Sequence, residues 1–272
     1  MEPRDIKMKE RLYIYWKIWV TVASYAFQET FLNRWTNALF LFGKLIRFGM
    51  LLVFLFLLHQ NISGIAGYSI DQVIVFYLTY QFTDTLAQIM YRGVYSFSTS
   101  VRTGELDFYL SKPINPLFRI LTGKPDILDV LFFFPTTAAS LWILSHLQLH
   151  ITFNSVVIYF ALLINSFLIV TAFHIFVACL GVLTTEVDNA IMLYRDFTNL
   201  SRFPVSIYGE PFRTVLLFVI PVGIMNTVPA QVLMHTQPSV GMLTAVLIGL
   251  GFFILSLRTW KWSIRKYTSA GG

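Results

Sequence analysis

The chain has 272 residues, of which 56% are hydrophobic and only 12% charged, and its mean hydropathy is +0.66. This composition excludes an ordinary soluble domain and indicates an integral membrane protein. The net charge is +6, and the one cysteine, Cys179, excludes an intrachain disulfide. With no change of composition along the chain, we expect a single all-α membrane domain, 1–272.

The first predicted helix, 11–31, is rich in aromatic side chains and carries Lys17. Amphipathic rings at this density are typical of the lipid headgroup region. We therefore expect an amphipathic helix that lies on the inner leaflet and does not cross the membrane.

Five segments contain the roughly 20 apolar residues that a membrane-crossing helix needs. They are 37–59, 72–97, 126–147, 155–182 and 240–258. Of the 20 Lys and Arg residues, 8 lie in 1–47, 5 in 92–124 and 4 in 258–266. Because Lys and Arg are retained on the cytoplasmic side, both termini are predicted to be cytoplasmic, in the inner membrane. This orientation requires an even number of spans.

A sixth crossing must come from 184–236, where two interpretations compete. In the first, 186–206 crosses as a polar helix and 211–236 is re-entrant, so that it enters and leaves on the same side. In the second, 186–210 stays inside and 212–233 crosses, as plain hydropathy favours. The breaks at Pro221 and Pro229 favour the first interpretation, because interrupted helices at membrane depth are shielded by protein.

Two of these segments place polar side chains inside the membrane. On 72–97 they recur at spacings of three or four residues and share one helix face: Gln81, Asp84, Gln88 and Tyr91. On 186–206, the fifth span of the first interpretation, they are Glu186, Asn189, Arg195 or Asp196, Asn199 and Arg202. A central Asp costs roughly 2.5 to 3.5 kcal/mol on insertion scales. Both faces are therefore expected to meet protein or water, not lipid.

Lys44 and Arg47 lie one helical turn apart inside the first span. At about 1.5 Å per residue, Arg47 and Asp84 lie at similar depths, about 16 and 20 Å above the inner ends of their helices. We therefore expect Asp84 to pair with Arg47 or Lys44. The alternative is that both cations extend to the inner headgroups.

A short charged hairpin, 98–116, is predicted to lie in the cytoplasm between the second and third spans. Gly104 and Pro113 bracket a single helical stretch. Glu105 and Asp107 lie near the start of this stretch, where negative charges interact favourably with the helix dipole. Its apolar side chains offer a face to a groove in another protein: Leu106, Phe108, Tyr109 and Leu110.

Recognisable catalytic and cofactor-binding motifs are missing from the sequence. Thr122-Gly123-Lys124 is followed by Pro125 and lacks the upstream glycine of a phosphate-binding loop. The Lys and Arg residues are concentrated at the predicted inner membrane edges. Membrane orientation and binding to anionic lipid account for this distribution better than binding to nucleic acid does. We expect no catalytic residue, cofactor or metal in this chain, and no nucleic-acid partner. Energy for any transport must then come from another protein.

The order of these elements resembles that of the ABC-2-type export permeases. Residues 102–115, from Arg102 to Asn115, are similar to the family's recurring pattern I-R-x-G-x-L-D-x-x-L-x-x-P, with Val101 where Ile is commoner. A second match to the family is 201–208, followed by 220–222 and 226–230. The resemblance covers essentially the whole chain, and its motifs are loose patterns without a catalytic signature.

The resemblance implies a half-transporter similar to type V exporters, with six spans and a partner ATPase that binds ATP and Mg²⁺. The hairpin would be the coupling helix that docks on the ATPase, through these residues: Arg102, Gly104, Glu105, Leu106, Asp107, Tyr109, Leu110, Lys112 and Pro113. Two permease copies, identical or paralogous, would meet along the second and fifth spans. The re-entrant segment, with Pro221, Asn226 and Pro229, would close the outer end of the pathway.

Two other functions are compatible with the sequence. A secondary transporter could use Asp84 with Arg195 and Asp196, although no internal repeat supports it. The chain could also be a membrane scaffold or assembly protein that carries out no transport of its own. The sequence does not choose among lipids, glycans, peptides and drug-like amphiphiles as substrates.

Overall fold

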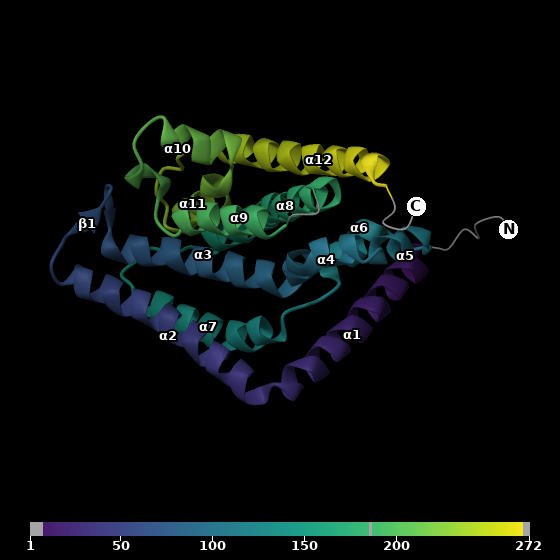
Figure 1. The fold of residues 1–272 in the computed structure, drawn as a ribbon. Helices are drawn as coiled ribbons and strands as arrows, with labels where there is room; N and C mark the ends of the chain where they lie inside the picture. Colours follow the sequence, from purple (N-terminus) through teal and green to yellow (C-terminus); the bar gives the residue numbers. More distant parts are fainter. Residues whose placement is uncertain (1–7, 185–186, 269–272) are drawn as a thin grey trace.

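The structure is a computed structural model that describes residues 8–184 and 187–268. It is an all-α bundle in two layers, one formed by α2, α3 and α7 and the other by α8, α9, α11 and α12 (Figure 1). The long helices are α2 (Arg34–His59), α3 (Ile70–Tyr91), α7 (Ile127–His146), α8 (Phe153–Thr184) and α12 (Met242–Lys266). Short helices and loops cover both ends of the bundle.

Helix α1 (Met8–Leu32) starts beside the short helices α4 (Phe97–Arg102), α5 (Glu105–Ser111) and α6 (Pro116–Thr122) and meets α2 at a sharp angle at its other end (Figure 1). Its Tyr15 hydroxyl accepts a 3.1 Å hydrogen bond from the Asn115 amide, and the Tyr15 ring contacts Phe118 edge-on at 4.7 Å. Other rings of α1, including Tyr13 and Trp16, are exposed. These exposed rings suit an interfacial helix of the predicted extent, 11–31.

Four helices in the described residues, α2, α7, α8 and α12, are long and apolar enough to cross a membrane. A fifth candidate is a bent pair within 212–233. The observed boundaries of the four helices lie within three residues of those predicted, except that α12 continues beyond 258 to Lys266. The protein is thus an all-α membrane protein with four or five candidate spans by length and hydropathy.

Helix α3 is too polar to meet the same criterion, but it is enclosed by the other helices and most of its side chains are buried. It ends at Tyr91 and not at the predicted 97, because 92–96 form the 3₁₀ helix η1. Gly93 allows the chain to approach α6 (Pro116–Thr122) here, since a Cβ on this residue would lie 3.0 Å from the Ile120 carbonyl oxygen.

A two-stranded hairpin joins α2 to α3 at one end of the bundle. Strand β1 (Gly64–Ile65) pairs antiparallel with β2 (Tyr68–Ser69), and Gly67 at the turn has a left-handed φ of 86°. Ser69 and Gln72 then form a reciprocal capping box that starts α3. The opposite end of the bundle holds α4 to α6, the start of α1 and the end of α12 (Figure 1).

The fifth predicted span, 186–206, contains a shorter helix than expected. Helix α9 (Asp188–Leu200) has 13 residues, and Pro204 follows in extended backbone before the 3₁₀ turn η2 (Val205–Ile207). Glu186, where the predicted span begins, lies outside the described residues.

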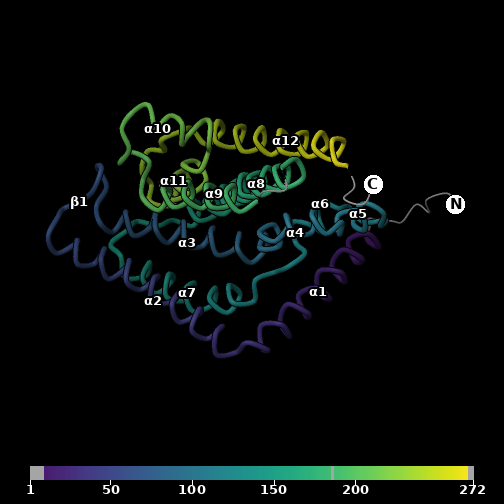
Figure 2. Tube along the Cα trace, viewed as in Figure 1, coloured from purple at the N-terminus to yellow at the C-terminus, as the bar shows by residue number. Residues whose placement is uncertain are grey.

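The segment 187–206 nevertheless follows α3 along most of its length. Val187 packs against α8 beside the first residue of α4. Asn199 accepts a 2.9 Å hydrogen bond from Tyr80, near the middle of α3. Ser206 donates a 3.4 Å hydrogen bond to the Ala66 carbonyl in the β hairpin. The segment therefore connects the two ends of the bundle, as the Cα trace also shows (Figure 2).

The next segment leaves the β-hairpin end and returns to it. It comprises α10 (Phe212–Thr214), the π-helical turn η3 (Val215–Val219) and α11 (Val222–Leu233). The pair bends by 89° at a break that contains Pro221. Near the end of α11, Gln231 donates a 2.6 Å hydrogen bond to Tyr68 of β2. Both ends of the predicted re-entrant stretch, 211–236, thus lie near the hairpin.

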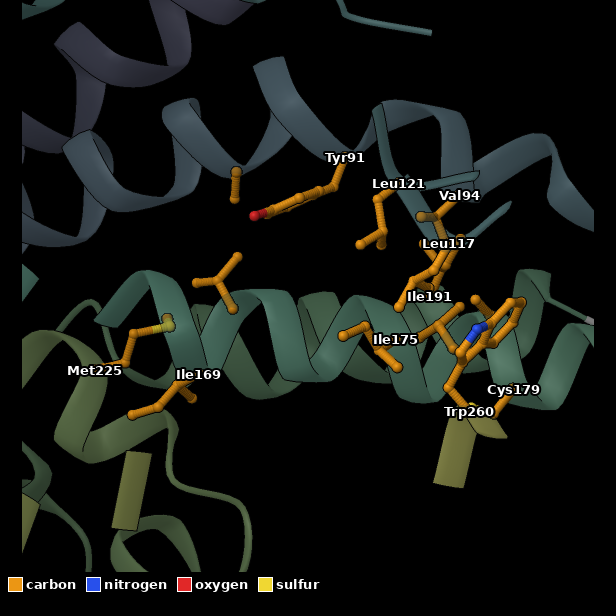
Figure 3. Close-up of a cluster of buried hydrophobic side chains, with 14 of the residues drawn as sticks. Tyr91, Val94, Leu117, Leu121, Ile169, Ile175, Cys179, Ile191, Met225 and Trp260 are labelled. Atoms are coloured by element: carbon orange, nitrogen blue, oxygen red, sulfur yellow. The ribbon is translucent and has the colours of Figure 1, made fainter. Parts of the chain in front are cut away.

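The main apolar core lies between α3 and α8 (Figure 3). Its members come mainly from α3, α4, α6, α8, α9, α11 and α12, with Leu106 from α5, and Ile169 and Ile175 of α8 are fully buried among them. His174 shares this core, where its Nδ1 lies 2.8 Å from the Val170 carbonyl and its ring packs on Tyr91 and Tyr194. This histidine is a satisfied core residue.

Candidate functional site

A polar cavity of about 270 Å³ lies between α2, α3, α7 and α9. Helix α3 supplies polar side chains spaced three or four residues apart, so that they face the same side. The polar and charged lining residues are Lys44, Arg47, Gln81, Asp84, Thr85, Gln88, Arg92, Asp129 and Arg195. The structure therefore brings together Gln81, Asp84, Gln88 and Arg195 from the two predicted polar faces.

Arg47 of α2 and Arg195 of α9 line this cavity together with Asp84. Asp84 takes no part in the ion pairs within 4.0 Å that the described residues form. Arg47 and Asp84 therefore line the same cavity but do not form the direct ion pair that was expected.

Lys44 has a different partner from the one expected. Its Nζ lies 2.7 Å from Asp129 and 4.0 Å from Asp126, both at the start of α7. Asp126 caps α7 by accepting hydrogen bonds from the Leu128 and Asp129 amides. Arg92 Nε, at the end of α3, lies 3.5 Å from Asp126. Four charged side chains thus tie α2, α3 and α7 together at one end of the cavity.

A second cavity of about 490 Å³ continues from the first toward the β-hairpin end and shares Arg47 and Gln81 with it. Apolar residues of α2, including Ile46, Met50 and Phe54, form one wall. These three side chains are exposed in the single chain. We call the two cavities together the polar groove.

Arg202 lines the second cavity and is held by neutral groups. Its Nη2 donates hydrogen bonds to Asn199 Oδ1 and, at 3.3 Å, to the Tyr80 hydroxyl. Its guanidinium lies 5.0 Å from the centre of the Tyr80 ring. Asn199, predicted as a pathway residue, thus positions Arg202 and is not itself among the lining residues.

Two other predicted pathway residues do not line the groove. Tyr91 is buried, and its hydroxyl shares a 2.6 Å hydrogen bond with Thr171 of α8. It therefore faces α8 on the side of α3 away from the groove. Asp196 is exposed on α9.

The predicted cytoplasmic hairpin forms two short helices, α4 (Phe97–Arg102) and α5 (Glu105–Ser111). Gly104 joins them with a left-handed φ of 74°, a conformation that favours glycine. Lys112 and Pro113 follow α5 in extended or turn backbone, as the bracketing by Gly104 and Pro113 predicts. Arg102, Lys112 and Pro113 are exposed.

Glu105 joins the two helices of the hairpin through hydrogen bonds. Its carboxylate accepts hydrogen bonds from Ser100, at 2.7 Å, and from the Tyr109 hydroxyl. These two bonds lower the pKa of Glu105 below its ordinary value. Burial, followed by the bond to Glu105, raises the pKa of Tyr109 to about 12, so Tyr109 stays a donor at physiological pH.

Leu106 does not belong to an exposed docking face. It is 0% exposed and packs in the main core, whereas Phe108 is 65% and Leu110 37% exposed. On a helix of seven residues only part of the apolar surface can point outward, and Leu106 faces the bundle. The surface open to a partner consists of Phe108 and Leu110, next to the exposed Glu105 and the partly exposed Tyr109.

The three predicted gate residues lie in or beside α11. Pro221 precedes the helix at the bend, and Pro229 lies inside it. Because Pro229 has no N–H, the Met225 carbonyl loses its helical partner, and the Ser166 hydroxyl of α8 donates to it instead. Asn226 is fully buried and donates a 2.7 Å hydrogen bond to Ser201. These bonds fix α11 against α8 and the segment after α9.

Comparison with known protein families gives a match over most of the chain. The family model described as "ABC-2 family transporter protein" matches residues 45–271. The chain belongs to this family. It is therefore a permease of the ABC transporter class and a multi-pass membrane protein, and the family implies association with ABC ATPase subunits. The comparison with curated proteins found no match.

No group of three or more His, Cys, Asp or Glu residues that could hold a metal occurs in the part of the chain that the structure describes. Members of the ABC-2 family are typically membrane components without catalytic activity of their own. The groove offers charged groups, hydrogen-bonding groups and an apolar wall, and these features are suited to binding a ligand.

The acidic residues that bind Lys44 and Arg92 were missed in the sequence. Asp129 is 85 residues from Lys44, so no local pattern links the two. Its position one turn inside a predicted span, 126–147, was a usable signal, because an acid at that position requires a partner.

Proposed function

We propose that the chain is the membrane subunit of an exporter driven by ATP that a separate ATPase subunit binds with Mg²⁺ and hydrolyses. The complete transporter would contain two permease copies in the inner membrane. The observation that carries the proposal is the exposed Phe108 on a hairpin that follows α3 after η1 and whose two helices are joined by the hydrogen bonds of Glu105. Movement of the hairpin would be transmitted to the helix that forms the floor of the polar groove.

The path of the chain supports six crossings: α2, α3, α7, α8, the segment 187–206 and α12. The segment 187–206 connects the two ends of the bundle, whereas 211–236 enters and leaves at the β hairpin. The start of α1 and the end of α12 lie at the α4–α6 end (Figure 1). With six crossings, both termini and the hairpin would face the cytoplasm, where an ATPase can reach Phe108.

The two permease copies would meet along the open side of the groove, where α2, α3 and α9 present polar residues. Asp84 and Arg195 would line the pathway. The buried helix α11 would close its outer end, since Asn226 and the Ser166 bond hold it in place.

Phe108→Asp tests this proposal, because it places a charge on the exposed hairpin surface without touching the core. We expect loss of ATPase co-purification and of ATP-dependent transport in reconstituted vesicles. Phe153→Asp is the matched control, since Phe153 is 86% exposed at the other end of the bundle. Unchanged co-purification of Phe108→Asp would contradict docking at the hairpin. Transport that follows an ion gradient and ignores ATP would contradict the whole proposal.

A further inference from the structure

The polar groove holds more positive than negative charge. Its lining includes five cations, Lys44, Arg47, Arg92, Arg195 and Arg202, but only two acids, Asp84 and Asp129. Asp129 is paired with Lys44 at 2.7 Å, and Arg92 is paired with Asp126 at 3.5 Å. Among the lining residues, Arg47, Arg195 and Arg202 therefore remain, with Asp84 as the one acid outside these ion pairs.

These three arginines have few partners in the described part of the chain. Arg47 forms no ion pair and no side-chain hydrogen bond there, and Arg202 bonds only to the neutral Asn199 and Tyr80. The Nε of Arg202 is buried and has no partner in this structure. Charges at membrane depth are normally paired, so an excess of guanidinium groups favours a negatively charged ligand.

In the proposed topology, Arg47 and Arg202 would lie at the depth of the bilayer interior. Tyr80, on which Arg202 stacks, is ten residues from the start of α3, which corresponds to about 15 Å. Arg47 belongs to both cavities and so connects the site near Asp84 with the site near Arg202. A ligand that contacts all three arginines would occupy the middle of the groove.

The wall of the second cavity is apolar and open. Ile46, Met50 and Phe54 recur at spacings of four residues on α2, and all three are exposed. An apolar chain can lie along this stripe while a charged group reaches the arginines. The groove thus combines an anion site with a hydrophobic track.

We propose that the polar groove binds an amphiphile whose headgroup bears a phosphate and carries a net negative charge. Guanidinium groups bind phosphate oxygens through paired hydrogen bonds, and Arg47, Arg195 and Arg202 would supply them. The acyl chain lies on Ile46, Met50 and Phe54. This inference rests on the proposed function, since it assigns the class of cargo that the pathway accepts.

The test uses purified permease in maltoside micelles without an ATPase. Phosphatidylglycerol and phosphatidylcholine with identical acyl chains are added in equal amounts, and bound lipid is counted by native mass spectrometry. We expect a preference for phosphatidylglycerol, which falls about tenfold or more in Arg47→Gln and Arg202→Gln, because each removes a charged hydrogen-bond donor. Arg258→Gln, an exposed arginine on α12, is the matched control and should keep the preference.

Two results would overturn the proposal. The first is equal occupancy by the two lipids in the unmodified protein, a measurement that needs no variant to fold. The second is an equal affinity for inorganic phosphate and for the lipid, which would show a site for a free anion to which the acyl chain adds nothing. Arg47→Lys keeps the charge and should retain part of the preference. Because no ATPase is present, failure here leaves docking at Phe108 intact, and failure of docking leaves this test valid.

Discussion

Lys44 and Asp129 show how a charge is accommodated near the end of the groove. The Asp129 side chain is only 6% exposed, compared with 34% for Lys44, and their atoms are 2.7 Å apart. Depth along the helix led to the expectation of Asp84 as partner, because counting residues gives height but not direction around the helix. The direction depends on how α2 and α7 pack, which the sequence does not state.

Lys44→Met should destabilise the protein by about 3 to 5 kcal/mol, because it leaves a buried carboxylate without its cation. Adding Asp129→Leu should recover most of the loss, since no unpaired charge then remains at that position. Thermal unfolding in detergent measures both effects. The combination of Lys44→Met with Asp84→Leu is the control, and rescue by this pair would show that Asp84 is the partner after all.

Glu105 gives the hairpin a defined pH dependence. Its folded-state pKa is lowered, so its contribution to stability is complete above the ordinary value of 4.5 and is lost as pH falls through the lowered value. Hydrogen-exchange protection of α5, corrected for intrinsic rates, should be constant near neutral pH and fall at acid pH. Glu105→Gln should have lower protection at neutral pH and a flatter profile. An unchanged profile in this variant would contradict the role of the two hydrogen bonds.

At the scale of elements, apolar runs predicted α2, α7 and α8 well, because lipid and the core both require long apolar helices. The hairpin helix was also predicted, since Gly104 and Pro113 set its limits. Its exposed face was not, because Leu106 and Phe108 are both apolar and only the packing of α5 decides which is buried. Burial of Leu106 means that Leu106→Asp would disrupt the bundle and would not report on docking.

Contact between α8 and α12 depends on a glycine. A Cβ on Gly249 would lie 2.1 Å from Asn165 Oδ1, and Asn165 donates a 3.1 Å hydrogen bond to the Ala245 carbonyl. Small residues allow such close packing of membrane helices. Gly249→Ala should therefore lower stability by about 1 to 3 kcal/mol through overpacking. Gly251→Ala is the matched control, because nothing lies within 4 Å of its added Cβ.

Thermal unfolding of the two alanine variants in the same detergent gives a direct comparison. The control should be neutral or slightly more stable, since alanine favours helix. Equal destabilisation of both variants would mean that the loss does not come from the Asn165 contact.

At the scale of the molecule, the path of 187–236 was the hardest feature to predict. Hydropathy favours a crossing at 212–233, because this segment is apolar and a hydropathy average contains no information on where the two ends of a segment lie. The structure places both ends near the β hairpin, and buried partners such as Ser166 satisfy the broken backbone of α11. The polar segment 187–206 can follow α3 because its buried face packs on protein and its polar face borders the groove.

Single cysteines can decide between the two topologies. Cys179 is buried and can be replaced by Ser, after which Ala66, Gly209, His235 and Thr103 are changed to Cys one at a time. If 187–206 crosses and 211–236 is re-entrant, a membrane-impermeant maleimide should label the first three positions from outside intact cells. Thr103, in the hairpin, should react only after permeabilisation. Labelling of His235 from outside with protection of Gly209 would instead make 212–233 the crossing and leave 187–206 inside, because the chain would then cross between those two positions.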